Sequence, residues 1–115
     1  VASRGLGDVY KRQEFVDLYK AKFNKTLLID VREKEEFSKD SIQGSISIPL
    51  KNLEQNSYLE FIRKESLDKE VYTLCQLGKR SEKASKILHK FKIPSKSIEG
   101  GIEKMNQIIS KKRVA

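Results

Sequence analysis

The 115-residue chain has little of several residue types that build well-known kinds of site. It has one cysteine and one histidine, which excludes an internal disulfide and a zinc site made of cysteine and histidine ligands. No apolar run approaches the roughly 20 residues that a membrane-spanning helix needs. The first residues lack the apolar stretch and the small-residue cleavage site of a secretory signal. We therefore expect a cytoplasmic protein that has no membrane contact, no metal and no cofactor.

The net charge of +8 raises the question of a nucleic-acid partner. The basic residues are spread along helical stretches together with acidic ones, as in "RKESLDKE" and "RSEKASK". Aromatic residues are not interleaved with them in a pattern that could stack on bases. This distribution favours solvated helix faces over a nucleic-acid surface.

The first 13 residues, "VASRGLGDVYKRQ", show no apolar periodicity. Their last part, "DVYKRQ", resembles the translation of a transposon end sequence that is used in preparing sequencing libraries. Segments of this kind are set apart when a fold is predicted. We therefore expect residues 1–13 to be a non-native or disordered leader and residues 14–112 to form the domain.

From residue 14 onward, apolar runs of strand length alternate with helical patterns. Four runs have the length and composition of buried strands: residues 26–31, 45–49, 71–75 and 96–99. Apolar residues recur at helical spacing between and around them, in residues 14–23, 53–65, 81–91 and 102–109. Residues 32–37, "REKEEF", form a charged turn or helix. The alternation predicts one α/β domain, with a mostly parallel sheet flanked by helices on both faces.

The single cysteine lies in "CQLGKRS", between the third predicted strand and the helix that follows it. This order places Cys75 at the carboxyl end of a strand, where open α/β sheets hold their ligands. We expect the helix to begin near Arg80 or Ser81, so that its free N–H groups and positive dipole end face the loop. Lys79 and Arg80 add positive charge, and Gly78 lets the backbone turn with its N–H groups inward. Together these features favour a thiolate, which is the nucleophilic form of cysteine.

Three other interpretations of this loop are weaker. A buried structural cysteine would not need a glycine and two cations within five residues. A nucleotide-binding P-loop would need glycine at the position of Thr73 and serine or threonine at the position of Arg80. A cysteine phosphatase loop would have five residues between cysteine and arginine, whereas four lie between Cys75 and Arg80 here. The smaller ring of amides suits a sulfur atom better than a phosphate.

Four motifs in this order resemble the rhodanese-like sulfurtransferases, over residues 14 to about 110. They are "LLIDVREKEEF", "SIQGSISIP", "CQLGKRS" and "IEGGIEKM". The second resembles the usual "HIPGAINIP", with Ser41 and Gln43 in place of histidine and proline. In the fourth, Met105 stands where tryptophan is usual. These departures fall mostly on positions that we interpret as structural.

The resemblance implies that Cys75 takes a sulfane sulfur from a donor, holds it as a persulfide and passes it to a nucleophile. The donor would be thiosulfate or a persulfidated protein. The backbone amides of the active loop would hold the terminal sulfur, and these belong to Gln76, Leu77, Gly78, Lys79 and Arg80.

The resemblance also implies roles for the surrounding side chains. Arg80 is expected to act with Cys75 in catalysis, Lys79 to add positive charge, and Ser81 to cap the helix. Asp30 and Arg32 are expected to form a buried supporting pair. His89 lies beside the apolar stripe of its helix and is expected to be exposed to solvent.

A narrower similarity concerns "IPLKNLE" and "CQLGKRSEKA", which resemble the C-terminal domain of adenylyltransferase–sulfurtransferase proteins. Those enzymes activate ubiquitin-like sulfur carrier proteins, in molybdopterin synthesis for example, so a carrier of this kind is a candidate acceptor. The alternatives are a stand-alone sulfurtransferase, a non-catalytic interaction or persulfide-sensing module, and a cysteine-based phosphatase.

Overall fold

The computed structural model describes residues 9–103. It contains five strands, β1 (Val9–Tyr10), β2 (Thr26–Asp30), β3 (Ile46–Ser47), β4 (Glu70–Leu74) and β5 (Lys96–Ile98). Four α-helices connect them, α1 (Arg12–Ala21), α2 (Lys34–Lys39), α3 (Asn56–Glu65) and α4 (Lys79–Lys90). Two short 3-10 helices complete the described part, η1 (Phe23–Lys25) and η2 (Leu50–Asn52).

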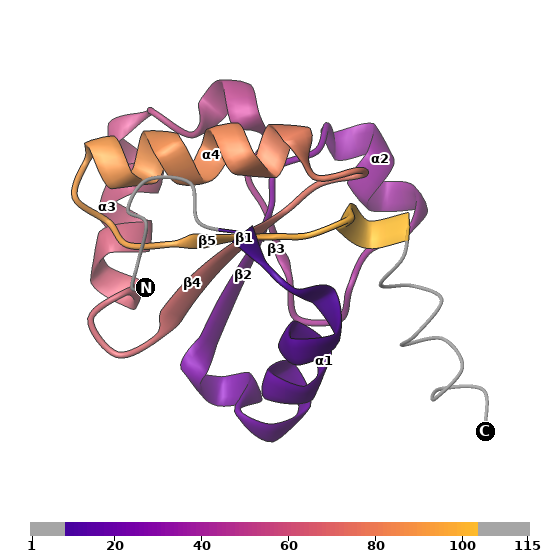
Figure 1. The fold of residues 1–115 in the computed structure, drawn as a ribbon. Helices are drawn as coiled ribbons and strands as arrows, with labels where there is room; N and C mark the ends of the chain where they lie inside the picture. The colour runs from indigo at the N-terminus through magenta and orange to yellow at the C-terminus, as the bar shows by residue number, and fades with distance from the viewer. Residues whose placement is uncertain (1–8, 104–115) are drawn as a thin grey trace.

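The strands form one sheet in the order β1-β5-β4-β2-β3, and every neighbouring pair is parallel (Figure 1). The central pair is β2 with β4, which is in register from Thr26 opposite Glu70 to Asp30 opposite Leu74. The chain segments that follow these two strands therefore leave the sheet side by side at its carboxyl edge. This register brings the segment after β2 next to the cysteine loop.

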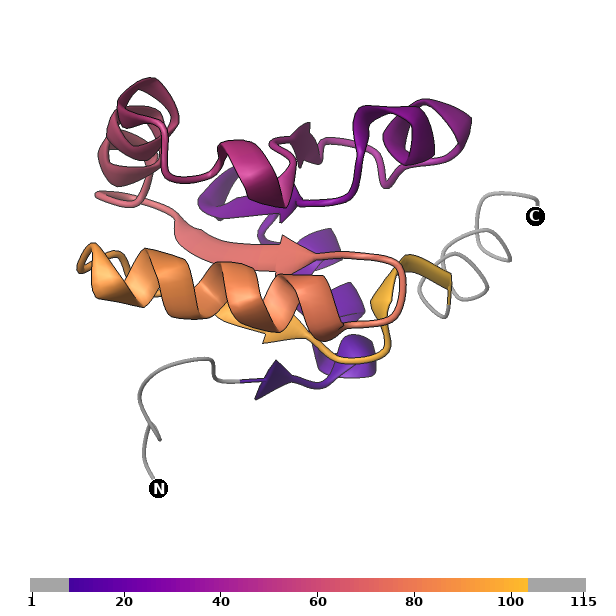
Figure 2. The same cartoon turned by 90° about the horizontal axis from the view of Figure 1, so that it is seen from above.

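Helices cover both faces of the sheet, as predicted, because the central strands alternate their side chains between two apolar clusters. In β2, Leu27 and Ile29 belong to the cluster that also contains residues of α3 and α4, whereas Leu28 belongs to the cluster with Phe15 of α1. Seen from above, α4 lies across β4 and β5 (Figure 2). The expected α/β architecture is confirmed.

The amino-terminal boundary of the fold differs from the expectation. Val9 and Tyr10, assigned to a leader, pair with Ser97 and Ile98 of β5 and form an edge strand. The ring of Tyr10 packs edge-on against that of Tyr72, with 5.2 Å between ring centroids. A two-residue strand shows no alternation, so the sequence pattern could not reveal it. Residues 1–8, and most of the helix predicted over residues 102–109, lie outside the described part of the chain.

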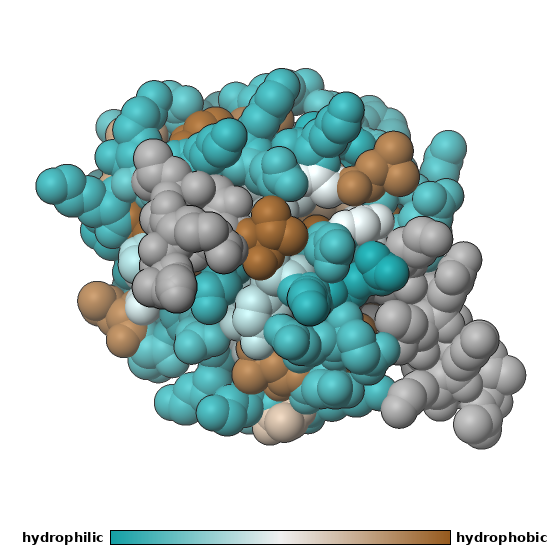
Figure 3. Space-filling model, in the orientation of Figure 1, coloured by the Kyte–Doolittle hydropathy of each residue, from teal (hydrophilic) through white to brown (hydrophobic). Residues whose placement is uncertain are grey.

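The face of the molecule seen in Figure 3 is mainly hydrophilic, and apolar residues appear on it as separate patches. Among residues 9–103, the large apolar side chains that are exposed belong to Val9, Phe23, Phe61, Leu67 and Leu77. Among the helices of the described residues, none has the length and apolar character needed to cross a bilayer.

Candidate active site

The cysteine loop runs from the end of β4 to the start of α4. Cys75 directly follows the last residue of β4, and α4 begins at Lys79, one residue earlier than expected. Gly78 is the N-cap of this helix and has a φ of 113°, a left-handed conformation that a side chain would oppose. The first turn of α4 is therefore aimed at the cysteine.

Backbone amides surround the sulfur atom of Cys75, whose side chain is buried with 1% of its surface exposed. The N–H of Gly78 donates to Sγ at 3.0 Å, and the N–H of Ser81 donates to it at 3.3 Å. Both donors belong to the free amino end of α4, where the partial positive charge of a helix is concentrated. Charge-assisted bonds of this kind are stronger than neutral ones, so the loop favours negative charge on the sulfur.

Ser81 does not cap the helix, contrary to the expectation. It is the third residue of α4, and its hydroxyl points into the protein because the side chain lies on the buried face of the helix. The hydroxyl donates to the carbonyl oxygen of Gly78 at 2.9 Å and lies 3.5 Å from the Cys75 sulfur. Ser81 is thus part of the sulfur environment through both its amide and its hydroxyl.

Asp30 and Arg32 form a buried ion pair at the end of β2. The Arg32 Nη2 donates to Asp30 Oδ2 at 2.8 Å, and its Nε donates to both carboxylate oxygens. Burial disfavours the charged guanidinium, but hydrogen bonds and charge interactions with Asp30 and Asp40 outweigh it and raise the pKa of Arg32. The Arg32 Nη1 also donates to Gln76 Oε1 at 3.1 Å, which ties the pair to the cysteine loop.

Arg80 makes a second ion pair, which the sequence analysis did not find. Its Nη1 and Nη2 donate to the two carboxylate oxygens of Glu36 at 2.8 and 3.0 Å. The hydrogen bond from Arg80 lowers the pKa of Glu36 to about 2 and raises that of Arg80 itself. Glu36 also accepts from the N–H of Glu33 in a capping box at the start of α2, but no local pattern signals its pairing with Arg80, which is 44 residues away.

The remaining loop side chains face solvent to different degrees. Leu77 is 67% exposed, Lys79 is exposed, and Gln76 is half-buried. Gly101 supports the loop backbone from the opposite side. A Cβ on Gly101 would lie 2.0 Å from the Gln76 carbonyl oxygen, and the N–H of Ile102 donates to the carbonyl of Cys75 at 2.8 Å. The "GG" turn therefore packs directly against the cysteine loop.

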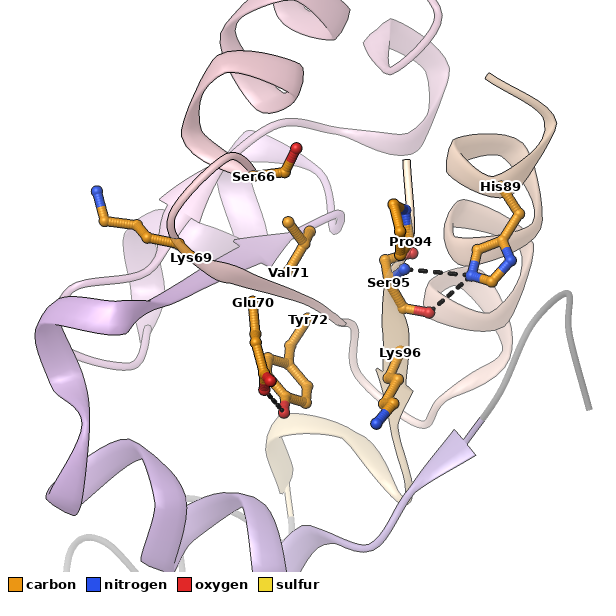
Figure 4. A pocket seen from close by; sticks show the side chains of 9 residues that line it. All are labelled: Ser66, Lys69, Glu70, Val71, Tyr72, His89, Pro94, Ser95 and Lys96. Atoms are coloured by element: carbon orange, nitrogen blue, oxygen red, sulfur yellow. Dashed lines mark hydrogen bonds between the residues drawn. The ribbon is translucent and has the colours of Figure 1, made fainter. Parts of the chain in front are cut away.

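His89 lies far from the cysteine, at the other end of α4, and its side chain is half-buried instead of exposed. When Nε2 carries the ring proton, it can donate to the carbonyl oxygen of Ser95 at 2.9 Å. When Nδ1 carries the proton, Nε2 can accept from the Ser95 N–H at 3.2 Å. Figure 4 shows His89 at the edge of a pocket of about 420 Å³, with Glu70 and Lys96 at the starts of β4 and β5. This pocket contains no residue of the cysteine loop.

The site is thus a pair of helix-terminal amides and a buried hydroxyl around one sulfur, bordered by two ion pairs.

The rhodanese-like domain family model matches residues 13–107 of this chain. A probable molybdopterin-synthase adenylyltransferase of Gracilaria tenuistipitata var. liui is 38% identical over 81 residues, 70% of this chain and 22% of the relative. The adenylyltransferase and sulfurtransferase UBA4 of Yarrowia lipolytica is 39% identical over 83 residues, 68% of this chain and 19% of the relative.

The chain therefore spans about a fifth of the length of these curated relatives. Among solved structures, the reduced Bacillus anthracis CoADR-RHD superimposes with a TM-score of 0.72 at 31% sequence identity. That match covers 90% of this chain and 17% of the other. The family resemblance read from the four motifs is confirmed: this chain belongs to the rhodanese-like domain family.

Proposed function

We propose that the chain is a sulfurtransferase domain in which Cys75 carries a sulfane sulfur as a persulfide. The observation that carries the proposal is the pair of N–H groups, from Gly78 and Ser81, that donate to Sγ at 3.0 and 3.3 Å. An anionic sulfur is the species that such donors stabilise. The family and the sulfurtransferase named among its relatives support the same chemistry.

The first half-reaction loads the cysteine. With thiosulfate as the donor, the Cys75 thiolate attacks the outer sulfur and forms a new S–S bond to it. The S–S bond inside thiosulfate breaks, and sulfite leaves with the electron pair. The amides at the start of α4 and the positive end of that helix favour the negative charge, first on the thiolate and then on the persulfide.

The second half-reaction unloads it. A nucleophilic acceptor attacks the terminal sulfur, the S–S bond to Cys75 breaks, and the thiolate returns with its electron pair. We propose that the physiological acceptor is the adenylated C-terminus of a ubiquitin-like sulfur carrier protein, and with this acceptor the persulfide is itself the nucleophile. Its terminal sulfur attacks the activated carbonyl carbon, a C–S bond forms, and the bond from that carbon to the phosphate oxygen breaks as AMP leaves. A thiol reductant then attacks the Cys75 sulfur, the S–S bond breaks and the carrier thiocarboxylate leaves with the electron pair, and a second thiol restores the Cys75 thiolate by forming a disulfide with the first. This proposal is supported by relatives whose names combine adenylyltransferase with sulfurtransferase or molybdopterin synthase, and whose chains extend well beyond this domain.

Intact-mass spectrometry after incubation with thiosulfate tests the persulfide directly. The protein is expected to gain the mass of one sulfur atom, and cyanide or a reductant is expected to remove it. The matched control is Cys75→Ser, which should fold, gain no sulfur and have no thiosulfate:cyanide activity, because a hydroxyl cannot carry sulfane sulfur. Activity that persists in Cys75→Ser contradicts the assignment. Turnover of an aryl phosphate without any sulfur adduct would favour a phosphatase.

A further inference from the structure

Ser97 in β5 is a buried polar residue at the active site, although no sequence motif marks it. Its side chain is 1% exposed, and its Oγ lies 2.7 Å from the Oγ of Ser81. The Ser81 Oγ in turn lies 3.5 Å from the Cys75 sulfur. The Ser81 hydroxyl therefore lies next to the Cys75 sulfur, and the Ser97 hydroxyl lies next to that of Ser81, further into the protein interior.

The direction of these hydrogen bonds follows from counting protons. The Ser81 hydroxyl has one proton, and it is donated to the Gly78 carbonyl oxygen, which can only accept. The Ser97 hydroxyl must then donate to the Ser81 Oγ, which is the one partner of that hydroxyl within residues 9–103. A protonated Cys75 donates to the same oxygen. One donor and two acceptor positions of Ser81 are thus all in use.

We propose that Ser97 is a positioning residue that turns the Ser81 hydroxyl into a third donor for the anionic sulfur. The inference rests on the sulfurtransferase function proposed above, because it concerns the thiolate and persulfide states. When Cys75 loses its proton to solvent, the S–H donor disappears and the Ser81 proton can rotate towards the negative sulfur. No proton passes from one serine to the other.

Two observations support this rotation. The Gly78 carbonyl does not become unpaired, because the N–H of Glu82 also donates to it at 3.1 Å. Ser97 continues to donate to the Ser81 oxygen throughout, which polarises the Ser81 O–H bond and makes it a stronger donor. Without Ser97, the Ser81 oxygen would lose this buried partner, and its hydroxyl would be a weaker and less well oriented donor.

A second group of buried hydroxyls in the same interface provides a matched control. Thr73 donates to the carbonyl of Ser81 at 2.8 Å, and Ser85 joins Thr73 to Ser95 through Oγ contacts of 3.0 and 3.1 Å. This branch ends on the Ser81 backbone and does not reach its hydroxyl. Ser85→Ala therefore removes the same kind of group from the same interface without touching the path to the sulfur.

The test is a pH titration of the full chain, followed by the ultraviolet absorbance of the thiolate. The chain has one cysteine, so the signal comes from Cys75, and Cys75→Ser supplies the baseline. Among the described residues, Arg80 on α4 interacts with the charge of Cys75, and Arg80 is paired with Glu36 on α2; the Asp30–Arg32 pair at the end of β2 contacts the loop through Gln76. No hydrogen bond links Ser97 to any of these described groups, so substitutions at Ser97 leave them in place.

Ser97→Ala is expected to raise the titration midpoint by about half a pH unit, a roughly threefold loss of thiolate below the midpoint. Ser97→Thr should restore the wild-type midpoint, whereas Ser97→Val, which has the shape of threonine without its hydroxyl, should not. Ser85→Ala should keep the wild-type midpoint even if it lowers stability. If Ser97→Ala does not fold, the threonine and valine variants decide the question.

An unchanged midpoint in Ser97→Ala, or in Ser97→Val where Ser97→Ala does not fold, overturns the proposal. An equal rise in Ser85→Ala also overturns it, because the effect would then be one of general packing. The titration needs no sulfur donor, so it is separate from the test of the proposed function. A missing sulfur adduct with a displaced midpoint would refute the persulfide and leave the role of Ser97 standing for the thiolate.

Discussion

Arg32 and Arg80 both border the cysteine loop, and the protein holds them in different ways. The Arg32 side chain is 1% exposed and has Asp30, Asp40 and Gln76 as side-chain partners. The Arg80 side chain is 35% exposed and forms its ion pair with a single carboxylate, that of Glu36. The first arginine belongs to the interior of the domain, and the second forms a bridge between α2 and α4 at its surface.

The difference in burial suits Arg32 to supporting the loop and leaves Arg80 accessible from solvent. A buried charge is tolerated only when its partners are complete, so the Asp30–Arg32 pair holds the end of β2 and, through Gln76, the loop in one arrangement. A half-exposed pair can exchange its partner for water or for an anion at little cost. Arg80 can therefore exchange its partner more readily than Arg32 can.

The comparison predicts its largest effect for matched leucine substitutions. Arg32→Leu leaves the buried Asp30 carboxylate without its partner and should lower the free energy of unfolding by about 3–5 kcal/mol. Arg80→Leu should cost about 1 kcal/mol or less. Urea denaturation followed by circular dichroism measures both. Similar losses in the two variants would show that burial does not distinguish the arginines.

An intermediate effect is expected for Glu36→Gln, and it should depend on pH. Folding lowers the Glu36 pKa from 4.5 to about 2, chiefly through the hydrogen bond from Arg80, so the carboxylate stabilises the fold fully above pH 4.5. This contribution is lost as the pH falls from 4.5 towards 2. At neutral pH the variant should be less stable by about 1 kcal/mol, since solvent screens the pair.

The measurement is the difference in unfolding free energy between wild type and Glu36→Gln across this pH range. Glutamine does not ionise, so the difference should be constant near neutral pH and should shrink in acid. A difference that stays the same down to pH 2 would show that the ionised form of Glu36 is not what stabilises the pair.

The smallest effect on stability is expected for Lys79→Ala. Lys79 is exposed at the start of α4, and its loss should change the unfolding free energy by less than about 0.5 kcal/mol. It should raise the KM for thiosulfate roughly twofold to threefold at low salt, because the charge attracts an anionic donor, and the effect should fade at high salt.

Lys83→Ala removes an exposed charge from the same helix, one turn further from the loop, and is the matched control for this experiment. It should have a smaller effect on the KM. Equal effects of the two substitutions would mean that overall charge, and not the position of Lys79, attracts the donor.

Local sequence patterns determined the alternation of strands and helices after β1 and placed the cysteine between a strand and a helix. The apolar run that became β4, the glycine at position 78 and the helical stripe that became α4 each depend on residues close in the chain. Asp30 and Arg32 are two residues apart, so their pair could also be expected from a local motif. Short-range propensity and periodicity are sufficient for features of this kind.

Only the tertiary structure decided which side chains meet around the sulfur. Glu36 and Arg80 are 44 residues apart, as are Arg32 and Gln76, and Ser97 of β5 contacts Ser81 of α4. Such contacts depend on the register of β2 with β4 and on the rotation of α4 about its axis. The strand at Val9–Tyr10 is of the same kind, because its hydrogen bonds come from β5 and not from its own sequence pattern. The sequence around each of these residues does not indicate its partner, because the partners come together only when the whole sheet assembles.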